Sequence, residues 1–282
     1  MINVEKAGFY TTIQDAGRRG FRHLGIPVSG PMDRMAFRLA NALLPNKNDD
    51  TVLECTFVGP QLKIGVELAF VVTGAPVELW LDQEPIVLYK VYKAKAGSIL
   101  KMGKVLKGIR SYIRFSKALE LPSILGSRSF FYPLTSEKTL KTGDVLTFQG
   151  QENSVGKANA QLRANLNYLD ESQLEVSPGL DWAMLPKRSQ ETVLTETHEV
   201  ISHNRMGYRL STSVRFQASS LLSQLILPGM VQLTPGGELL IATADCQVTG
   251  GYLQALQLSP KALATLAQKA EGSRLTFENT HL

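Results

Sequence analysis

The sequence predicts a mainly β protein, folded as an antiparallel barrel or sandwich with a few short helices. Short apolar segments rich in strand-forming residues, separated by glycine and proline, recur along most of the 282 residues. Many short strands at close spacing are typical of antiparallel barrels and sandwiches. A phrase of turn followed by strand recurs at 95–103, 141–149 and 270–278. It favours two similar β units, although so short a phrase fits any hairpin.

One amphipathic helix is expected near the N-terminus. Apolar residues recur at positions 32, 35, 36, 39, 40, 43 and 44, which is the spacing of a helix that buries one stripe. Pro31 suits the first helical position, with Ser29 or Gly30 as the cap and Asp33 in the first turn. Pro45 should end the helix.

The expected strands follow in two groups, separated by a polar segment. The first group comprises 52–59, 61–75, 77–81, 86–92, 98–103, 111–116 and 144–149. The second comprises 174–179, 197–211, 213–219, 230–235, 238–245 and 274–278. Because 151–173 is rich in Asn and Gln and poor in strand formers, it is the predicted linker. A second helix is expected after Ser259 as cap and Pro260 as first residue, with Gly272 as its stop.

The composition is that of an ordinary globular protein, and its charge and cysteine content indicate the kind of partner and the compartment. The net charge of +5 suits anionic substrates or an acidic partner, but no basic motif or aromatic platform indicates nucleic acid. Cys55 and Cys246 are isolated, which argues for a reducing compartment and against a structural zinc or a disulfide framework. The N-terminus has no basic start followed by an apolar segment, and no apolar run is long enough to span a membrane. We therefore expect a cytoplasmic protein.

A basic stretch runs from 85 to 119 and contains no acidic residue. Two interpretations remain open: a solvated sheet edge on which lysines discourage aggregation, or a docking surface for an acidic partner. Its cations are Lys90, Lys93, Lys95, Lys101, Lys104, Lys107, Arg110, Arg114 and Lys117.

Candidate chemistry begins in the N-terminal segment, because the common catalytic signatures are absent from the sequence. Hydroxyl, amide, acidic and basic side chains gather there: Thr11, Thr12, Gln14, Asp15, Arg18, Arg19, His23, Ser29 and Asp33. Arginines beside such groups can bind a carboxylate or phosphate, and Asp15 could orient an arginine or act as a base. Equally, Asp15 and Arg18 could pair with each other while Gly17, Gly20 and Gly25 permit tight turns.

Two further polar groupings lie in the second half. Residues 203–209 carry a histidine, an asparagine and two arginines at the entry to a strand. Residues 244–252 run from a strand into an acid, an amide, a hydroxyl and a glycine pair, which lets a ligand approach the backbone closely. An inert, packed thiol is the favoured interpretation of Cys246. Metal binding at His198 and His203 is not expected, because this segment predicts a strand.

Together these groupings resemble the KipA-like proteins. This family is also called the C subunit of the bacterial ATP-dependent 5-oxoprolinase, and it is related to part of the carboxyltransferase domain of urea carboxylase. The resemblance lies in TTIQDAGRRG with GIPVSGPMDRMAFRLAN at 11–41, LECT with GP at 53–60, VTGA at 72–75, LGSRS at 125–129, NRMGYRL at 204–210 and ADCQVTGGY at 244–252. The phrases follow one another in order across nearly the whole chain.

The resemblance implies two tandem cyclophilin-like β-barrels, at 1–150 and 174–282 with the linker 151–173 between them. It implies a hydrolase component that is active only in a complex, with a KipI-like B subunit and a LamB/YcsF-like A subunit. That complex would convert 5-oxoproline to glutamate with ATP, and Mg would be the counterion of the nucleotide. ATP would be shared with the partner or bound by it.

The resemblance also suggests roles for individual residues. Catalytic roles would fall to Asp15, Arg18, Arg205 and Asp245. Substrate binding would fall to Thr12, Gln14, Ser29, Asp33, Arg209, Gln232, Gln247, Thr249, Gly250 and Tyr252. No residue is expected to bind a metal.

The chain departs from the family pattern at several positions. Asn204 stands where the family commonly has an acid, so a base is lost there, and Lys117 and Ala118 replace a glycine pair. Residues 130–142 lack the glycines of a usual loop, and the approach to Gln232 and Leu239 is unusual. Two other functions therefore stay open: a regulatory protein that binds a KipI-like kinase inhibitor, and a carboxyltransferase component that receives biotin from elsewhere.

Overall fold

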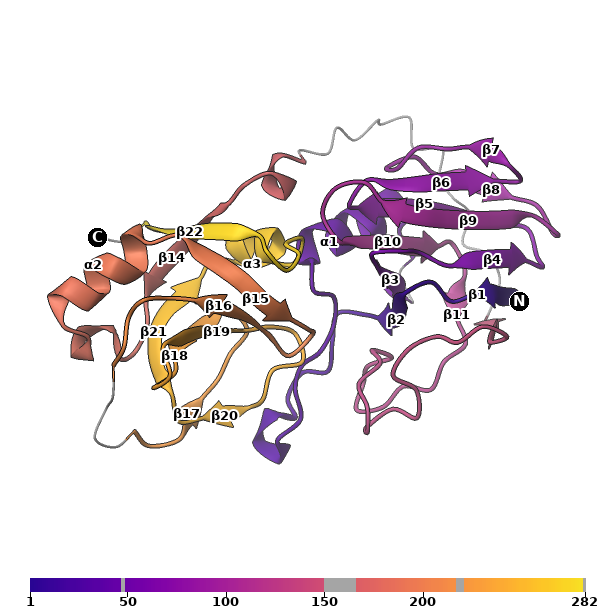
Figure 1. Ribbon diagram of the computed structural model, residues 1–282. Coiled ribbons are helices and arrows are strands. Elements are labelled where there is room, and N and C mark those ends of the chain that lie inside the picture. Colours follow the sequence, from indigo (N-terminus) through magenta and orange to yellow (C-terminus); the bar gives the residue numbers. More distant parts are fainter. Residues whose placement is uncertain (47–48, 150–165, 217–220, 281–282) are drawn as a thin grey trace. The chain divides into compact units, whose positions relative to one another are not determined.

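The computed structural model describes residues 1–46, 49–149, 166–216 and 221–280, and its chain contacts divide into two units (Figure 1). Unit 1 comprises Met1–Arg18 and Ser29–Asn165, and unit 2 comprises Arg19–Val28 and Leu166–Leu282. The fold is mainly β, which confirms the predicted class. The predicted boundary at 150 and most of the predicted linker lie outside the described residues. Residues 19–28 belong to unit 2, although the prediction assigned all of 1–150 to the first barrel.

Unit 1 contains two facing antiparallel sheets. The six-stranded sheet has the order β12 (Val145–Leu146), β1 (Ile2–Lys6), β4 (Gln61–Ile64), β9 (Ile99–Val105), β6 (Val77–Leu81) and β7 (Glu84–Pro85). The five-stranded sheet has the order β2 (Tyr10–Gln14), β3 (Val52–Thr56), β10 (Arg110–Phe115), β5 (Leu68–Gly74) and β8 (Tyr92–Ala94). A small pair joins β11 (Ala118–Leu119) to β13 (Phe148–Gln149).

The five-stranded sheet is buried on both faces. One face packs on the six-stranded sheet through a shared apolar core that includes Leu62, Leu100, Phe70 and Ile113. The other face is covered by α1 (Arg34–Leu43), whose buried residues pack on side chains of β3, β5 and β10. Every residue of β3, β5 and β10 is therefore buried, whereas β4 and β9 show the alternation of a sheet with one wet face.

The cap of α1 differs from the prediction. The helix begins at Arg34, and the carboxylate of Asp33 accepts hydrogen bonds of 2.9 Å from the backbone N–H groups of Met35 and Ala36. Ser29 and Gly30, the predicted caps, instead have positive φ in the turn before the helix. Asp33 is the N-terminal cap because its backbone is extended and its short carboxylate reaches the two backbone N–H groups of the first turn. The expected end is confirmed, because Leu44 is the C-terminal cap and Pro45 follows.

Unit 2 is a closed barrel with small additions. Its strand order is β14 (Gln173–Pro178), β21 (Leu253–Leu258), β18 (Met230–Leu233), β19 (Glu238–Ala242), β16 (Gly207–Ser211), β15 (His198–His203) and β22 (Arg274–Asn279). The parallel pairing of β14 with β22 closes it. Outside the barrel, β17 (Gln224–Leu225) pairs with β20 (Thr249–Gly250). Single turns of 3-10 helix lie at η1 (Arg22–Leu24), η2 (Asn167–Leu169) and η3 (Trp182–Met184).

Two α-helices lie in unit 2, and the sequence predicted one of them. The helix α3 (Pro260–Leu266) begins as expected, with the Ser259 hydroxyl accepting from the Ala262 N–H at 3.1 Å. The helix α2 (Lys187–Thr195) was missed. It is mostly polar and buries only Gln190 and Val193, so it has no apolar stripe for the sequence to reveal.

The repeated phrase is a repeated turn. Gly97, Gly143 and Gly272 all have φ between 82° and 96°, and the next residue donates its N–H to the carbonyl three residues back at 3.1 Å each time. This is the geometry of a turn that needs positive φ at its third position, where glycine is unstrained. Two of these turns lie in unit 1 and one in unit 2. The phrase therefore marks a local turn rather than equivalent units.

Several predicted strands are wrong. Segment 86–92 forms a strand only at Tyr92, and the described part of 213–219 forms none. In contrast, β1, β2 and β21 were not predicted. In β2 the polar residues Thr11, Thr12 and Gln14 are buried, which hides the period-2 pattern. In β1 the pattern is present, with Ile2 and Val4 buried, but the strand is only five residues long. No helix within the described ranges is long and apolar enough to cross a membrane.

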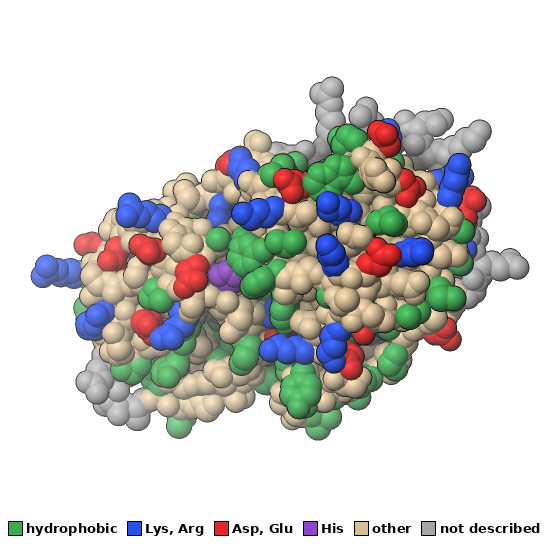
Figure 2. Space-filling view, turned by 45° about the vertical axis from the view of Figure 1, so that its right-hand side comes forward, with side chains coloured by type: hydrophobic (Ala, Val, Ile, Leu, Met, Phe, Trp, Pro, Cys, Tyr) green, Lys and Arg blue, Asp and Glu red, His purple; other side chains and the backbone are tan. Residues whose placement is uncertain are grey.

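The basic stretch separates into two kinds of side chain. Arg110 and Arg114 are buried, whereas the lysines from 90 to 107 are exposed. Acidic residues Glu78, Asp82 and Glu84 come from β6 and β7 and the turn between them, in the sheet that also contains β9. Blue and red side chains are interspersed on the face seen in Figure 2. Lys93 lies on the edge strand β8, whereas Lys101 and Lys104 lie on the inner strand β9, so the stretch is in part a solvated sheet face rather than a sheet edge.

We expect Asp33→Ala to lower the free energy of unfolding by about 1–2 kcal/mol, because two amide groups of α1 lose their acceptor. Asp33→Ser should recover most of that loss. Urea denaturation of both variants checks this, with Ser259→Ala as the matched cap deletion in unit 2. A loss as large in Asp33→Ser as in Asp33→Ala would show that the hydrogen bonds to the cap are not the cause.

Candidate functional site

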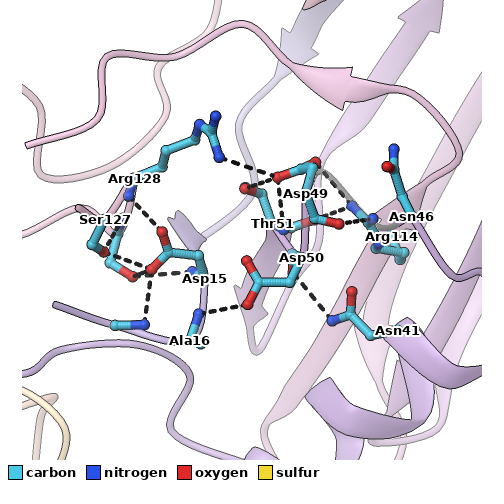
Figure 3. Close-up of polar contacts among 12 residues, drawn as sticks. Asp15, Ala16, Asn41, Asn46, Asp49, Asp50, Thr51, Arg114, Ser127 and Arg128 are labelled. Carbon is cyan, nitrogen blue, oxygen red and sulfur yellow. Dashed lines mark hydrogen bonds and ion pairs between the residues drawn. The ribbon is translucent and has the colours of Figure 1, made fainter. Parts of the chain in front are cut away.

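The carboxylate of Asp15 is the most heavily hydrogen-bonded group of the predicted site (Figure 3). It follows β2 directly and accepts from the hydroxyls of Ser127 at 2.6 Å and Ser129 at 2.7 Å. The backbone N–H groups of Gly17 and Arg128 donate to it at 2.9 and 2.5 Å. Burial raises the pKa of Asp15, but these hydrogen bonds outweigh it and hold the pKa below its usual range. Asp15 is therefore a fixed anion that joins the end of β2 to the loop 127–129.

A second carboxyl group lies beside the Asp15 loop. Asp50 accepts from the N–H of Ala16 at 3.1 Å, and its own carbonyl accepts from the side chain of Asn41. The pKa of Asp50 is raised, first by burial and then by the charges of Asp15 and Asp49. Figure 3 shows one carboxyl oxygen of Asp50 outside any dashed contact. No pattern in the sequence selects Asp50, because its surroundings come from three separate segments.

The opposite pKa shifts of Asp15 and Asp50 are the pattern of an acid–base pair. One carboxyl stays ionised while its neighbour can hold a proton nearer to neutral pH. Asp49 takes a structural part, because it forms a buried 3.0 Å ion pair with Arg114. Arg114 also donates to the carbonyl of Thr51 at 2.8 Å. Of the two carboxyl groups, Asp50 therefore gains a proton first as the pH falls.

Most other polar residues of the N-terminal segment face inward, whereas Arg19 and His23 are exposed. Arg18 is 1% exposed and donates to the carbonyl of Ser129 at 2.6 Å and to the hydroxyl of Ser29 at 3.2 Å. Gln14 donates to the hydroxyl of Thr12 at 3.0 Å, and both are buried.

These contacts differ from both interpretations of the segment, an anion site and an Asp15–Arg18 pair. Asp15 and Arg18 both contact the same loop, 127–129, so they act together in joining it to the N-terminal segment. Asp33 caps α1. Roles for Arg18, Thr12, Gln14, Ser29 and Asp33 in catalysis or substrate binding stay predictions.

Unit 2 contains a pocket of about 240 Å³. Three predicted substrate-binding residues line it, namely Arg209, Gln232 and Gln247. Apolar side chains, including those of Ile226 and Leu240, form much of the rest. Such a mixture of apolar walls and a few polar groups is typical of sites for small molecules.

A buried ion pair fixes one edge of this pocket. Arg205 Nε and Asp245 Oδ2 are 2.8 Å apart, with a second contact of 3.3 Å from Nη2 to Oδ1, and the two side chains are 8% and 9% exposed. The N–H of Asp245 also donates to the carbonyl of Arg205 at 2.8 Å. The pair thus ties the turn before β16 to the loop that carries Cys246 and Gln247. Arg205 and Asp245 are positioned beside the lining residues rather than among them, and their catalytic roles stay predictions.

Two neighbours of the pocket alter its chemistry. Arg22, which is not among the predicted site residues, belongs to unit 2 and donates to the carbonyl of Ile226. Burial raises the pKa of the Cys246 thiol, and the nearby Arg22 guanidinium offsets only part of that increase. Cys246 is therefore a neutral, buried thiol, as expected of an inert cysteine.

The remaining predicted residues lie at the margin of the pocket. Thr249 and Tyr252 are exposed and do not line it, whereas Gly250 touches its lining residues. His198 is buried, and its two ring nitrogens contact the carbonyls of Ser211 and Val193. Within the described ranges, no three acidic, histidine or cysteine side chains are grouped so that they could hold a metal ion.

The sequence that folds into these two units matches one class of protein, the carboxyltransferase domains. Residues 24–279 match the family described as carboxyltransferase domain, subdomain A and B, and the chain belongs to this family. The 5-oxoprolinase C subunit of Haemophilus influenzae is 32% identical over 295 residues, covering 100% of this chain and 92% of that protein. The protein of the same name from Escherichia coli is 30% identical, covering 98% of this chain and 90% of that protein.

Solved structures share the fold but are longer. The crystal structure of the K. lactis urea amidolyase has a TM-score of 0.86 and 28% identity, covering 98% of this chain and 18% of that one. The crystal structure of TTHA0988 has a TM-score of 0.86 and 26% identity, covering 98% of this chain and 55% of that one. This chain thus spans about half the length of TTHA0988 and a smaller part of the amidolyase.

The two carboxyl groups of unit 1 should affect stability with opposite dependence on pH. The pKa of Asp15 is lowered by folding, so its contribution is complete above the unfolded pKa and is lost as pH falls through the folded value. We expect Asp15→Asn to cost about 2–4 kcal/mol at pH 7, because an amide nitrogen would face hydrogen-bond donors, and to cost less near pH 3.

The control for this prediction is Asp50→Asn, which keeps an acceptor for the Ala16 N–H. Because the pKa of Asp50 is raised by folding, its ionisation destabilises the protein increasingly as pH rises from the unfolded pKa toward the folded one. Asp50→Asn should therefore match wild type at low pH and melt at a higher temperature at pH 7. Calorimetry from pH 3 to 8 checks both variants, and parallel pH profiles would contradict the assignment.

Breaking the Arg205–Asp245 pair should strongly destabilise unit 2. Arg205→Ala leaves the Asp245 carboxylate buried without its cation, and we expect a cost of about 3–5 kcal/mol. The double variant Arg205→Ala/Asp245→Ala should lose less than the two single losses combined, because the uncompensated charge is gone. A double-mutant cycle by urea denaturation measures this, and additive losses would argue against a coupled pair.

Proposed function

We propose that this chain acts as the C subunit of an ATP-dependent 5-oxoprolinase, which opens 5-oxo-L-proline to L-glutamate in complex with two other proteins. The observation that carries the proposal is a similarity that extends through both units to proteins of that name, over 90% or more of their length. The yeast urea amidolyase, by contrast, matches 54% of this chain and 8% of its own length. The pocket of unit 2 has the size of a small-molecule site.

The chemistry of the lactam explains the requirement for ATP. Amide resonance makes the ring carbonyl a poor electrophile, and transfer of the γ-phosphoryl group to the lactam oxygen gives an activated imidate and ADP. This step also releases the lactam N–H proton, so it needs a base. Addition of water and cleavage of the ring C–N bond give glutamyl phosphate, and a second water releases phosphate and glutamate. In this proposal, the B and C subunits carry out the phosphorylation, and the A subunit completes ring opening.

The size of the pocket indicates which ligand this chain binds and which ligand a partner binds. The pocket of about 240 Å³ is below the usual range for ligand sites, which suits a small substrate better than a nucleotide. We therefore assign ATP and its Mg to a KipI-like B subunit.

Reconstitution tests the proposal. The chain should be co-purified with a KipI-like and a LamB/YcsF-like partner, and phosphate release should be followed with and without 5-oxoproline. We expect ATP hydrolysis only when 5-oxoproline is present, together with stoichiometric glutamate. Turnover of ATP that is indifferent to 5-oxoproline would refute the enzyme proposal.

Two alternatives have their own support. The inward contacts of Arg18, Arg205 and Asp245 favour a regulatory protein that binds a KipI-like kinase inhibitor without turnover. Under that alternative the two-chain complex forms normally but stays inactive with 5-oxoproline. The family description favours a carboxyltransferase component that uses biotin from another protein. Inhibition of the reconstituted activity by avidin would identify that case.

A further inference from the structure

Gly250 packs against three side chains that line the pocket of unit 2, and it leaves no room for a side chain of its own. A Cβ atom built on Gly250 would lie 2.5 Å from Ile226 Cδ1, 2.9 Å from Gln247 Nε2 and 3.5 Å from Gln232 Nε2. All three neighbours line the pocket. Gly250 therefore marks the point on which two side-chain amides converge, one from β18 and one from the loop before β20.

These two amides have capacity for a ligand. Gln247 is exposed and forms no side-chain hydrogen bond to any described residue. Gln232 is 3% exposed, and its side chain has one long contact, 3.5 Å from Nε2 to the carbonyl of Tyr252. A register shift in the pairing of β18 with β21 occurs between Val231 and Gln232, where this side chain leaves the regular sheet pattern. A buried amide held by a single long hydrogen bond gains from a better partner.

The remaining lining residues indicate the shape and charge of the ligand. Ile226 and Leu240 provide an apolar wall for a small ring. Arg209 lies at the lining, 52% exposed and 2.5 Å from Glu238 Oε2, so its outer N–H groups can still reach a carboxylate. The fit is to a small, flat, amide-containing ring that also carries an anionic group.

We propose that this pocket binds the amide edge of the substrate, with the Gln232 and Gln247 side chains pairing with a cis N–H and C=O. A lactam fixes its N–H and C=O on one edge, and a glutamine carboxamide offers the complementary acceptor and donor. One carboxamide can thus form two antiparallel hydrogen bonds with the ring, while the second donates to the other lone pair of the lactam oxygen. Arg209 takes the carboxylate. This inference rests on the proposed function, of which it names the substrate-binding residues.

The same amide edge is present in urea, which lacks the ring and the carboxylate. Three probes distinguish a lactam ligand from urea. They are 5-oxoproline, 2-pyrrolidinone, which lacks only the carboxylate, and urea. Titration of each into the purified full chain by calorimetry or NMR needs neither ATP nor partner proteins. We expect 5-oxoproline to bind most tightly, 2-pyrrolidinone to bind roughly tenfold more weakly for want of the Arg209 contact, and urea to bind least.

The decisive variants are a matched glycine pair. Gly250→Ala places a methyl group against Ile226 and the two amides, and should weaken binding of 5-oxoproline at least about tenfold. Gly251→Ala is the control, because among the described residues its Cβ would meet only the carbonyl of Leu221 at 3.8 Å, and its binding should equal wild type. Gln247→Leu removes one exposed amide without altering the core and should weaken binding similarly. Melting temperatures identify any variant that fails to fold.

The possible outcomes separate this inference from the proposed function. Binding of 5-oxoproline that both Gly250→Ala and Gln247→Leu weaken, and Gly251→Ala leaves intact, supports the pocket. Equal binding by all four proteins, or no saturable binding of any probe, overturns it. If urea binds best and the Gly250 and Gln247 variants lose it, the amide pocket stands and the 5-oxoprolinase proposal fails. If the reconstituted enzyme hydrolyses 5-oxoproline with Gly250→Ala as fast as with wild type, the function stands and this pocket fails.

Discussion

The hydrogen bonds to the buried Asp15 carboxylate are the contact on which the polar half of unit 1 depends. A carboxylate removed from water is costly unless donors replace its hydration, and here two hydroxyls and two backbone N–H groups do so. In return, the carboxylate fixes the end of β2 against the loop 127–129. Arg18 contacts the same loop from another side. Burial acts on the neighbouring Asp50 with fewer donors to oppose it, so the pKa of Asp50 rises.

Unit 2 also contains a buried carboxylate, that of Asp245, which is stabilised by an ion pair with Arg205. Arg205 and Asp245 neutralise each other where two loops meet at the edge of the barrel. That arrangement leaves the next residues, Cys246 and Gln247, at the pocket without requiring a strand to hold them. The ion pair thus fixes the position of a loop that carries pocket residues. Removing it would change loop position and stability together, so a loss of activity alone would not assign Arg205 or Asp245 a chemical role.

Some helix ends and the recurrent turn were predictable, since they depend on neighbouring residues, but α3 ends at Leu266 rather than at the predicted Gly272. Ser259 was correctly identified as a cap, and the recurrent turn phrase contains a glycine with positive φ each time. The cap of α1 was misplaced because several nearby residues can serve, and backbone geometry chose Asp33. Strand β2 was not predicted because polar residues occupy its buried positions. Of the site, the sequence selected Arg209, Gln232 and Gln247, but Asp50 and Arg22 carry no local signal.

The sequence by itself determined the mainly β class, two of the helices, the family and the segments that carry polar function. These follow from local spacing and from residue types, which act over a few positions. Only the tertiary structure decided which charged groups are consumed in holding loops and which remain for a ligand. That division depends on contacts between residues more than a hundred positions apart, such as Asp15 with Ser127 and Ser129. Burial and the number of available donors, rather than residue type, set the pKa and the accessibility of each group.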